Sequence, residues 1–96
     1  MVIIMLSQLI DEKILLLKEL MNPKNKPLVN DTYQTQIDAI RSIDDYDIEN
    51  VEAIIKQKKE LLKKSRDVQE TERLLAEIDA LQWLQAQIVV MTLGAN

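Results

Sequence analysis

The second half of the chain, residues 48–93, reads IENVEAIIKQKKELLKKSRDVQETERLLAEIDALQWLQAQIVVMTL and contains neither glycine nor proline. Apolar residues recur in it at three- and four-residue spacing, which is typical of an amphipathic helix. As one continuous helix, this stretch of about 46 residues would be ~69 Å long. Both of its ends are rich in apolar residues, but residues 63–73 contain Val68 as their single apolar residue. The middle is therefore either a solvated helix or a break.

Helix start and stop signals bear on the choice between a continuous helix and a break. Asp67 and Glu70 have the spacing of a capping box, which would start a new helix. However, the segment has no glycine or asparagine that would close the preceding helix. We therefore expect one long helix over about 47–93, and a break near 65–67 is the alternative.

The first half of the chain predicts two shorter helices. A linker at 22–30, with prolines at 23 and 27, separates a helix over about 2–21 from a helix over about 31–43. Asn30 or Asp31 would cap the second of these helices. The apolar stripe of the first helix consists of Ile3, Leu6, Ile10, Ile14, Leu17 and Met21.

These elements predict an all-α fold, a single helical domain over residues 1–96. The two shorter helices would pack on the long C-terminal helix, as in a helical bundle or coiled coil. The first helix matches the C-terminal apolar segment in length, so we expect the two to run antiparallel with Met1 near Met91, and the second helix to lie on the start of the long one. Because two helices cannot cover all of this apolar surface between themselves, we expect oligomerisation to complete the bundle.

Composition excludes most catalytic chemistry. The 96 residues include no histidine and no cysteine, which removes the usual general base, the thiolate nucleophile and the commonest metal ligands. A single glycine, Gly94, leaves no phosphate-binding loop. The acidic cluster around Asp45 lacks the glycine of a calcium loop and is better explained as a helix start. We therefore expect no enzyme activity, no cofactor and no metal.

The apolar stripes at the two ends of the chain predict the partner-binding residues. Trp83 stands out among them, because Ala80 and Ala86 nearby leave room beside its ring, and tryptophan is common at binding hot spots. Ordinary core packing of Trp83 is the alternative. The predicted partner-binding residues are Ile3, Leu6, Ile10, Leu17, Leu81, Trp83, Leu84, Ile88 and Met91.

A basic run offers a second candidate site. The side chains of Lys56, Lys59, Lys63 and Arg66 would share one face of a continuous helix and could attract an anion. The competing interpretation is a solvated face supported by intrahelical pairs such as Glu60 with Lys64. The chain's formal net charge of −4 and its three aromatic residues disfavour nucleic acid as the ligand.

Together these patterns predict a non-enzymatic protein–protein interaction module of the adaptor, inhibitor or chaperone type. It would bury apolar helix faces against itself or against another protein. The alternative is an oligomeric binder of a small anionic or nucleotide ligand through the basic face at 56–66. Charged residues from Asp11 to Glu19 interrupt the N-terminal apolar segment before it could span a membrane, and it lacks a cleavage signal, so we expect a cytoplasmic protein.

Overall fold

The computed structural model describes the backbone of residues 2–94 and the side chains of residues 6–93. This part of the chain contains four helices and no strand, which confirms the all-α prediction. The helices are α1 (Val2–Leu20), α2 (Pro27–Arg41), α3 (Ile48–Lys64) and α4 (Val68–Gly94).

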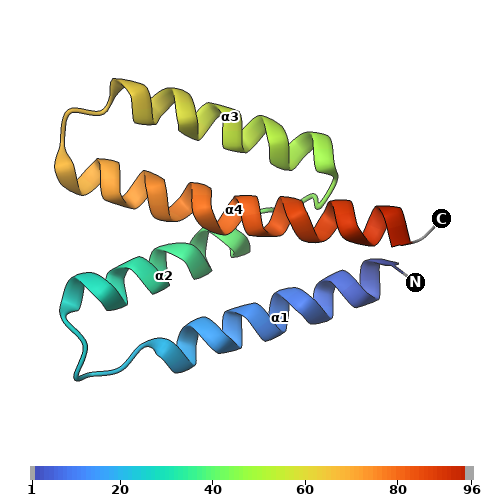
Figure 1. Ribbon diagram of the computed structural model, residues 1–96, viewed down its shortest axis with the longest axis horizontal. Helices are drawn as coiled ribbons and strands as arrows, with labels where there is room; N and C mark the ends of the chain where they lie inside the picture. Colours follow the sequence, from blue (N-terminus) through green and yellow to red (C-terminus); the bar gives the residue numbers. More distant parts are fainter. Residues whose placement is uncertain (1, 95–96) are drawn as a thin grey trace.

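The four helices form two antiparallel pairs, α1 with α2 and α3 with α4 (Figure 1). Helix α4 contacts each of the other three helices, whereas α2 and α3 do not contact each other. The second helix therefore packs on α4 and α1, not on the start of the third as the sequence suggested. Helix α1 and the C-terminal part of α4 run antiparallel, with their free ends on the same side (Figure 1). Met1 itself lies outside the described residues.

The arrangement is a plate. Its extents are 43 × 33 × 18 Å and its radius of gyration is 14.2 Å. A compact chain of this length would have a radius of gyration of about 12.5 Å. A flat molecule exposes more surface for its volume than a round one, and two broad faces of this protein are open to solvent.

The predicted continuous helix over 47–93 is wrong and the alternative, a break near 65–67, is confirmed, because the chain turns back at these residues. Ser65 is extended (φ −70°, ψ 134°), and its N–H donates to the carbonyl oxygen of Leu62 at 3.2 Å. Asp67 then caps α4, because its Oδ1 accepts the N–H of Gln69 at 3.3 Å. None of the described residues has a positive φ, so the missing glycine is no obstacle to this turn. Folding back brings Val51 of α3 into the same apolar core as α4.

The start of the second helix also differs from the prediction. Helix α2 begins at Pro27, the first helical position, where a missing N–H costs nothing. Asn30 is not a cap: its Oδ1 accepts the N–H of Asn22 at 3.2 Å, and its Nδ2 donates to the carbonyl oxygen of Asn22 at 2.9 Å. Its Oδ1 also accepts a hydrogen bond from Asn25 Nδ2 at 3.1 Å. Asn30 therefore fastens the connection between α1 and α2, and Asp31 is an exposed residue within α2.

A half-buried ion pair joins α3 to α4. Lys58 Nζ pairs with Glu77 Oε2, and the two side chains are 22% and 16% exposed. Arg73 Nε lies 3.5 Å from Glu77 Oε1 on the same helix. Glu77 thus balances two cations, and Lys58 belongs to the seam between the helices and not to a solvated basic face.

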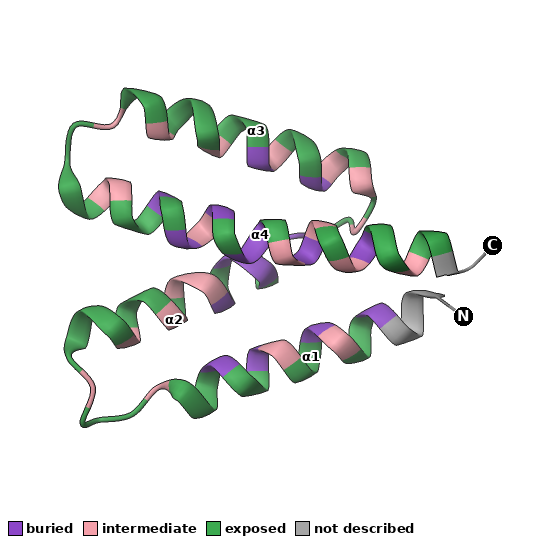
Figure 2. Ribbon diagram, viewed as in Figure 1, coloured by how far each residue is buried: buried purple, intermediate pink, exposed green. Residues whose placement is uncertain are grey.

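One apolar core runs through all four helices, and its residues lie on the sides that face each other (Figure 2). Burying a large aliphatic side chain completely contributes ~1.5–3 kcal/mol, so this core is the main source of stability. The buried members are Leu6, Ile10, Ile14, Leu17, Ile37, Ala39, Ile40, Ile43, Val51, Ile55, Ile78, Ala80, Leu81, Leu84 and Ile88.

Candidate functional site

Most of the predicted partner-binding residues lie inside the protein. The turn at 65–67 gives α4 a neighbour that a two-helix packing would lack, so the chain covers these side chains itself. Trp83 and Met91 are half-buried, and the side chain of Ile3 lies outside the described residues. The six residues buried in the chain's own core are Leu6, Ile10, Leu17, Leu81, Leu84 and Ile88.

The surface still carries much apolar area. Among residues 6–93, eleven large aliphatic side chains are between 39% and 70% exposed. Scattered exposed apolar residues are normal, so their arrangement matters more than their number. They are Leu15, Leu16, Leu20, Leu28, Val29, Leu61, Val68, Leu75, Val89, Val90 and Leu93.

One side of α1 carries two of these exposed residues, Leu16 and Leu20, together with Lys13, which contacts Trp83 of α4. Leu9, Lys13, Leu16 and Leu20 follow each other at spacings of four, three and four, so they lie on one side of the helix. Lys13 Nζ lies 5.3 Å from the centroid of the Trp83 ring, which shows that this side of α1 borders Trp83 of α4. We call these five residues the Trp83 surface.

Within this surface the apolar residues are partly open. Leu16 is 48% exposed and Leu20 is 45% exposed, while Leu9 and Trp83 are half-buried. Trp83 also packs against the apolar core. One portion of the Trp83 ring therefore contributes to the core, and another portion is accessible.

A shallow groove lies between α2 and α4, and several of its α4 residues share one side of the helix with Trp83. Glu72, Ala76, Asp79 and Trp83 are again spaced by four, three and four, which places them on one side of α4. The groove has a volume of about 440 Å³. It is lined by Leu28, Thr32, Gln36, Glu72, Leu75, Ala76 and Asp79.

The predicted basic face does not form as one helical stripe. Lys56, Lys59 and Lys63 are exposed on α3, but Arg66 lies beyond the end of that helix, in the connection to α4. Lys63 Nζ lies 3.5 Å from Glu60 Oε1, a solvated pair one turn away. Lys56, Lys59 and Lys63 thus still lie on one exposed side of α3, and Arg66 is the predicted residue that does not join them.

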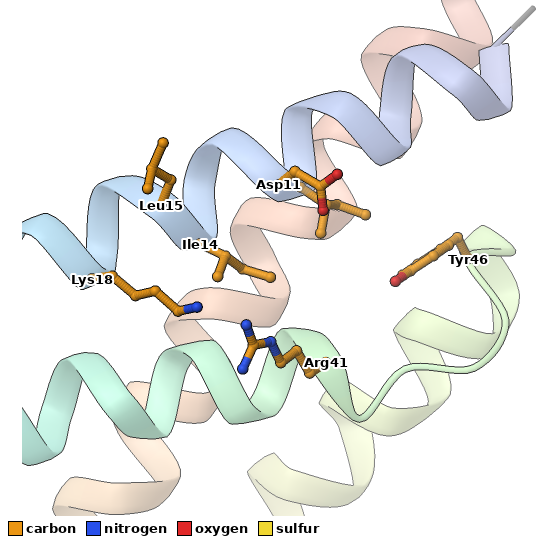
Figure 3. A pocket seen from close by; sticks show the side chains of 7 residues that line it. Asp11, Ile14, Leu15, Lys18, Arg41 and Tyr46 are labelled. Carbon is orange, nitrogen blue, oxygen red and sulfur yellow. The ribbon is translucent and has the colours of Figure 1, made fainter.

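A different set of cations lines an open pocket of about 510 Å³. It lies where α1 passes the end of α2 and the connection to α3 (Figure 3). Helix α1 supplies neighbouring positions on one side, while Arg41 and Tyr46 come from much later in the chain. Sequence reasoning missed this pocket, because no local pattern links Lys18 to Arg41. The lining residues are Ile10, Asp11, Ile14, Leu15, Lys18, Arg41 and Tyr46.

Two kinds of site are not found in the described part of the chain. Its His, Cys, Asp and Glu side chains form no group of three or more that could hold a metal ion. None of its helices combines the length and the apolar character needed to cross a membrane.

Comparison of the chain with protein-family models gave no match, and comparisons with curated proteins and with solved structures gave none either.

Proposed function

We propose that the protein is a non-enzymatic helical interaction module, of the adaptor, inhibitor or chaperone type, that binds through the Trp83 surface. The observation that carries this proposal is the side of α1 that exposes Leu16 and Leu20 and places Lys13 over the half-buried ring of Trp83. Tryptophan anchors surrounded by apolar contacts are typical of binding hot spots. Covering the exposed halves of Leu16 and Leu20 would contribute roughly 1 kcal/mol each.

A second copy of the chain is the partner that this surface fits best. Lys13 carries a positive charge on α1, and the groove beside Trp83 carries the carboxylates of Glu72 and Asp79. In a twofold arrangement the lysine of one copy can face the acidic groove of the other. A standard interface covers ~800 Å² per partner, and a broad face measuring 43 × 33 Å has room for that area.

Light scattering tests the self-association form of the proposal. We expect a mass above the 11.1 kDa of one chain at high micromolar concentration. The double variant Leu16→Glu/Leu20→Glu should be a helical monomer, because two charges would then have to be buried in the interface. The control is Leu61→Glu, which places one such charge at a 52% exposed position on α3 and should leave the mass unchanged.

Two outcomes would count against self-association. One is a well-folded wild-type monomer at high micromolar concentration, and the other is an equal loss of mass in the control and the double variant. If the wild-type protein is a monomer, a pull-down from the native host tests whether it binds another protein instead. The proteins captured by the wild type are compared with those captured by Trp83→Ala. Loss of a captured protein with retained helicity would assign the surface to that partner.

A further inference from the structure

The open pocket beside Arg41 uses a side of α1 that differs from the Trp83 surface. Asp11, Ile14, Leu15 and Lys18 are spaced by three, one and three residues, so they lie together on the helix. Lys13 of the Trp83 surface is two residues from Asp11, which points it to another side. The pocket is therefore separate from the proposed interaction surface and can be tested independently.

Two cations from different helices meet at one end of the pocket. The side chain of Lys18 extends toward the guanidinium group of Arg41, as Figure 3 shows. Within the described residues, no carboxylate oxygen lies within 4.0 Å of a nitrogen of either side chain. Two like charges that approach without a counter-charge repel each other, and an anion between them would relieve this repulsion.

The other residues that line the pocket indicate the shape and polarity of the rest of a ligand. Ile10 and Ile14 are buried and form an apolar floor, and Leu15 is 57% exposed beside them. Asp11 precedes Lys18 by two helical turns, a distance of ~10 Å along the helix axis. The hydroxyl of Tyr46 points into the same space (Figure 3). The cationic and anionic ends are thus separated by an apolar middle that a single aromatic ring could cover.

We propose that this pocket binds a small phosphate monoester with an apolar body. A phosphate monoester carries a charge of about −1.5 to −2 and three acceptor oxygens, which suits one lysine and one arginine approaching from two helices. Arginine binds such oxygens in a bidentate manner. The apolar body lies over Ile14 and Leu15, and Asp11 excludes a second anionic group from the far end.

Phenyl phosphate is the probe, and its binding is followed by amide chemical shifts. We expect saturable shifts at residues 10–18 and 41–46. Inorganic phosphate should bind more weakly because it lacks the apolar ring, and phenol should bind more weakly because it lacks the phosphate group. Arg41→Gln and Lys18→Gln should each weaken binding about tenfold, the effect of losing a charge-assisted hydrogen bond. Asp11→Asn should strengthen it, because phenyl phosphate offers that carboxylate no donor.

The matched control is Lys59→Gln, which removes an exposed cation from α3 and should leave the affinity unchanged. Circular dichroism checks that each variant keeps its helices. The proposal is overturned by an absence of saturable shifts, by inorganic phosphate binding as tightly as phenyl phosphate, or by an equal loss of affinity in the Lys59 control. Retained binding in Leu16→Glu/Leu20→Glu would support a pocket that does not depend on the proposed interaction surface.

Discussion

The ion pair between α3 and α4 gives the sharpest test of the turn at 65–67. In a continuous helix, Lys58 and Glu77 would be nineteen residues and ~28 Å apart, so they could not interact. In the folded-back structure they are paired, with exposures of 22% and 16%. The perturbation is a double-mutant cycle made of Lys58→Met, Glu77→Gln and the combination of both.

The structure predicts the order of the effects. Glu77→Gln leaves the half-buried Lys58 without its counter-charge, which should lower the free energy of unfolding by about 1–2 kcal/mol. Lys58→Met should cost less, because methionine keeps the apolar stem and Glu77 retains Arg73 at 3.5 Å. In the double variant the second change should cost little, so we expect a coupling energy of about 1 kcal/mol.

Urea unfolding followed by circular dichroism measures the cycle at one protein concentration, because self-association would add to the stability. The exposed pair of Glu60 and Lys63, with side chains 54% and 74% exposed, is the control, and its coupling should stay below ~0.5 kcal/mol. If the effects at Lys58 and Glu77 add within ~0.5 kcal/mol, this pair is coupled no more strongly than the exposed pair, and the reasoning that a half-buried ion pair links α3 to α4 is refuted.

Three further substitutions probe the core, the turn and the first connection. Ile40→Ala should cost ~2–5 kcal/mol in urea unfolding because Ile40 is fully buried, whereas Leu28→Ala, at a 57% exposed position, should cost less than ~1 kcal/mol. Asp67→Ala should cost about 1 kcal/mol in the same assay through loss of the α4 cap. Asn30→Ala should cost about 1 kcal/mol and speed hydrogen exchange at the amide of Asn22.

Each of these has a contradicting result. Equal effects at Ile40 and Leu28 would mean that the two helix faces are not differently buried. An unchanged stability in Asp67→Ala would remove the capping explanation of the turn. Unchanged exchange at Asn22 would show that the asparagine network does not hold the connection between α1 and α2.

The helices themselves could be predicted because their patterns are local. Apolar spacing located the helical regions, although it predicted α3 and α4 as one helix, and the two prolines marked the first connection. The sequence leaves the break at 65–67 only as the alternative, because no glycine or asparagine marks the end of the preceding helix. Ser65 closes α3 in an ordinary extended conformation, which no residue type signals. The start of α2 was misplaced because Pro27 was read as a stop, although proline is favoured at the first helical position.

The sequence predicted where the apolar stripes lie but not which of their residues are exposed. Apolar spacing on the terminal helices marked the residues that form the core, whereas the surface that a partner would cover stays a prediction. Which members of a stripe are covered by the chain itself depends on how many helices surround α4, and this follows from the turn. Leu81 and Leu84 are therefore core residues, while Leu16 and Leu20, on the flank of the α1 stripe, are exposed.

The sequence by itself determined that this protein is all-helical, that residues 63–73 are too polar to join a core, and that histidine and cysteine chemistry is absent. The tertiary structure alone decided that Lys18 and Arg41 line one pocket and that Lys58 pairs with Glu77. It also decided that Arg66 lies outside the helix that carries the three lysines. The physical reason is the separation along the sequence between the residues that interact. Helix formation depends on residues within a few positions of each other, whereas burial and charge pairing depend on which distant segments the turns bring into contact.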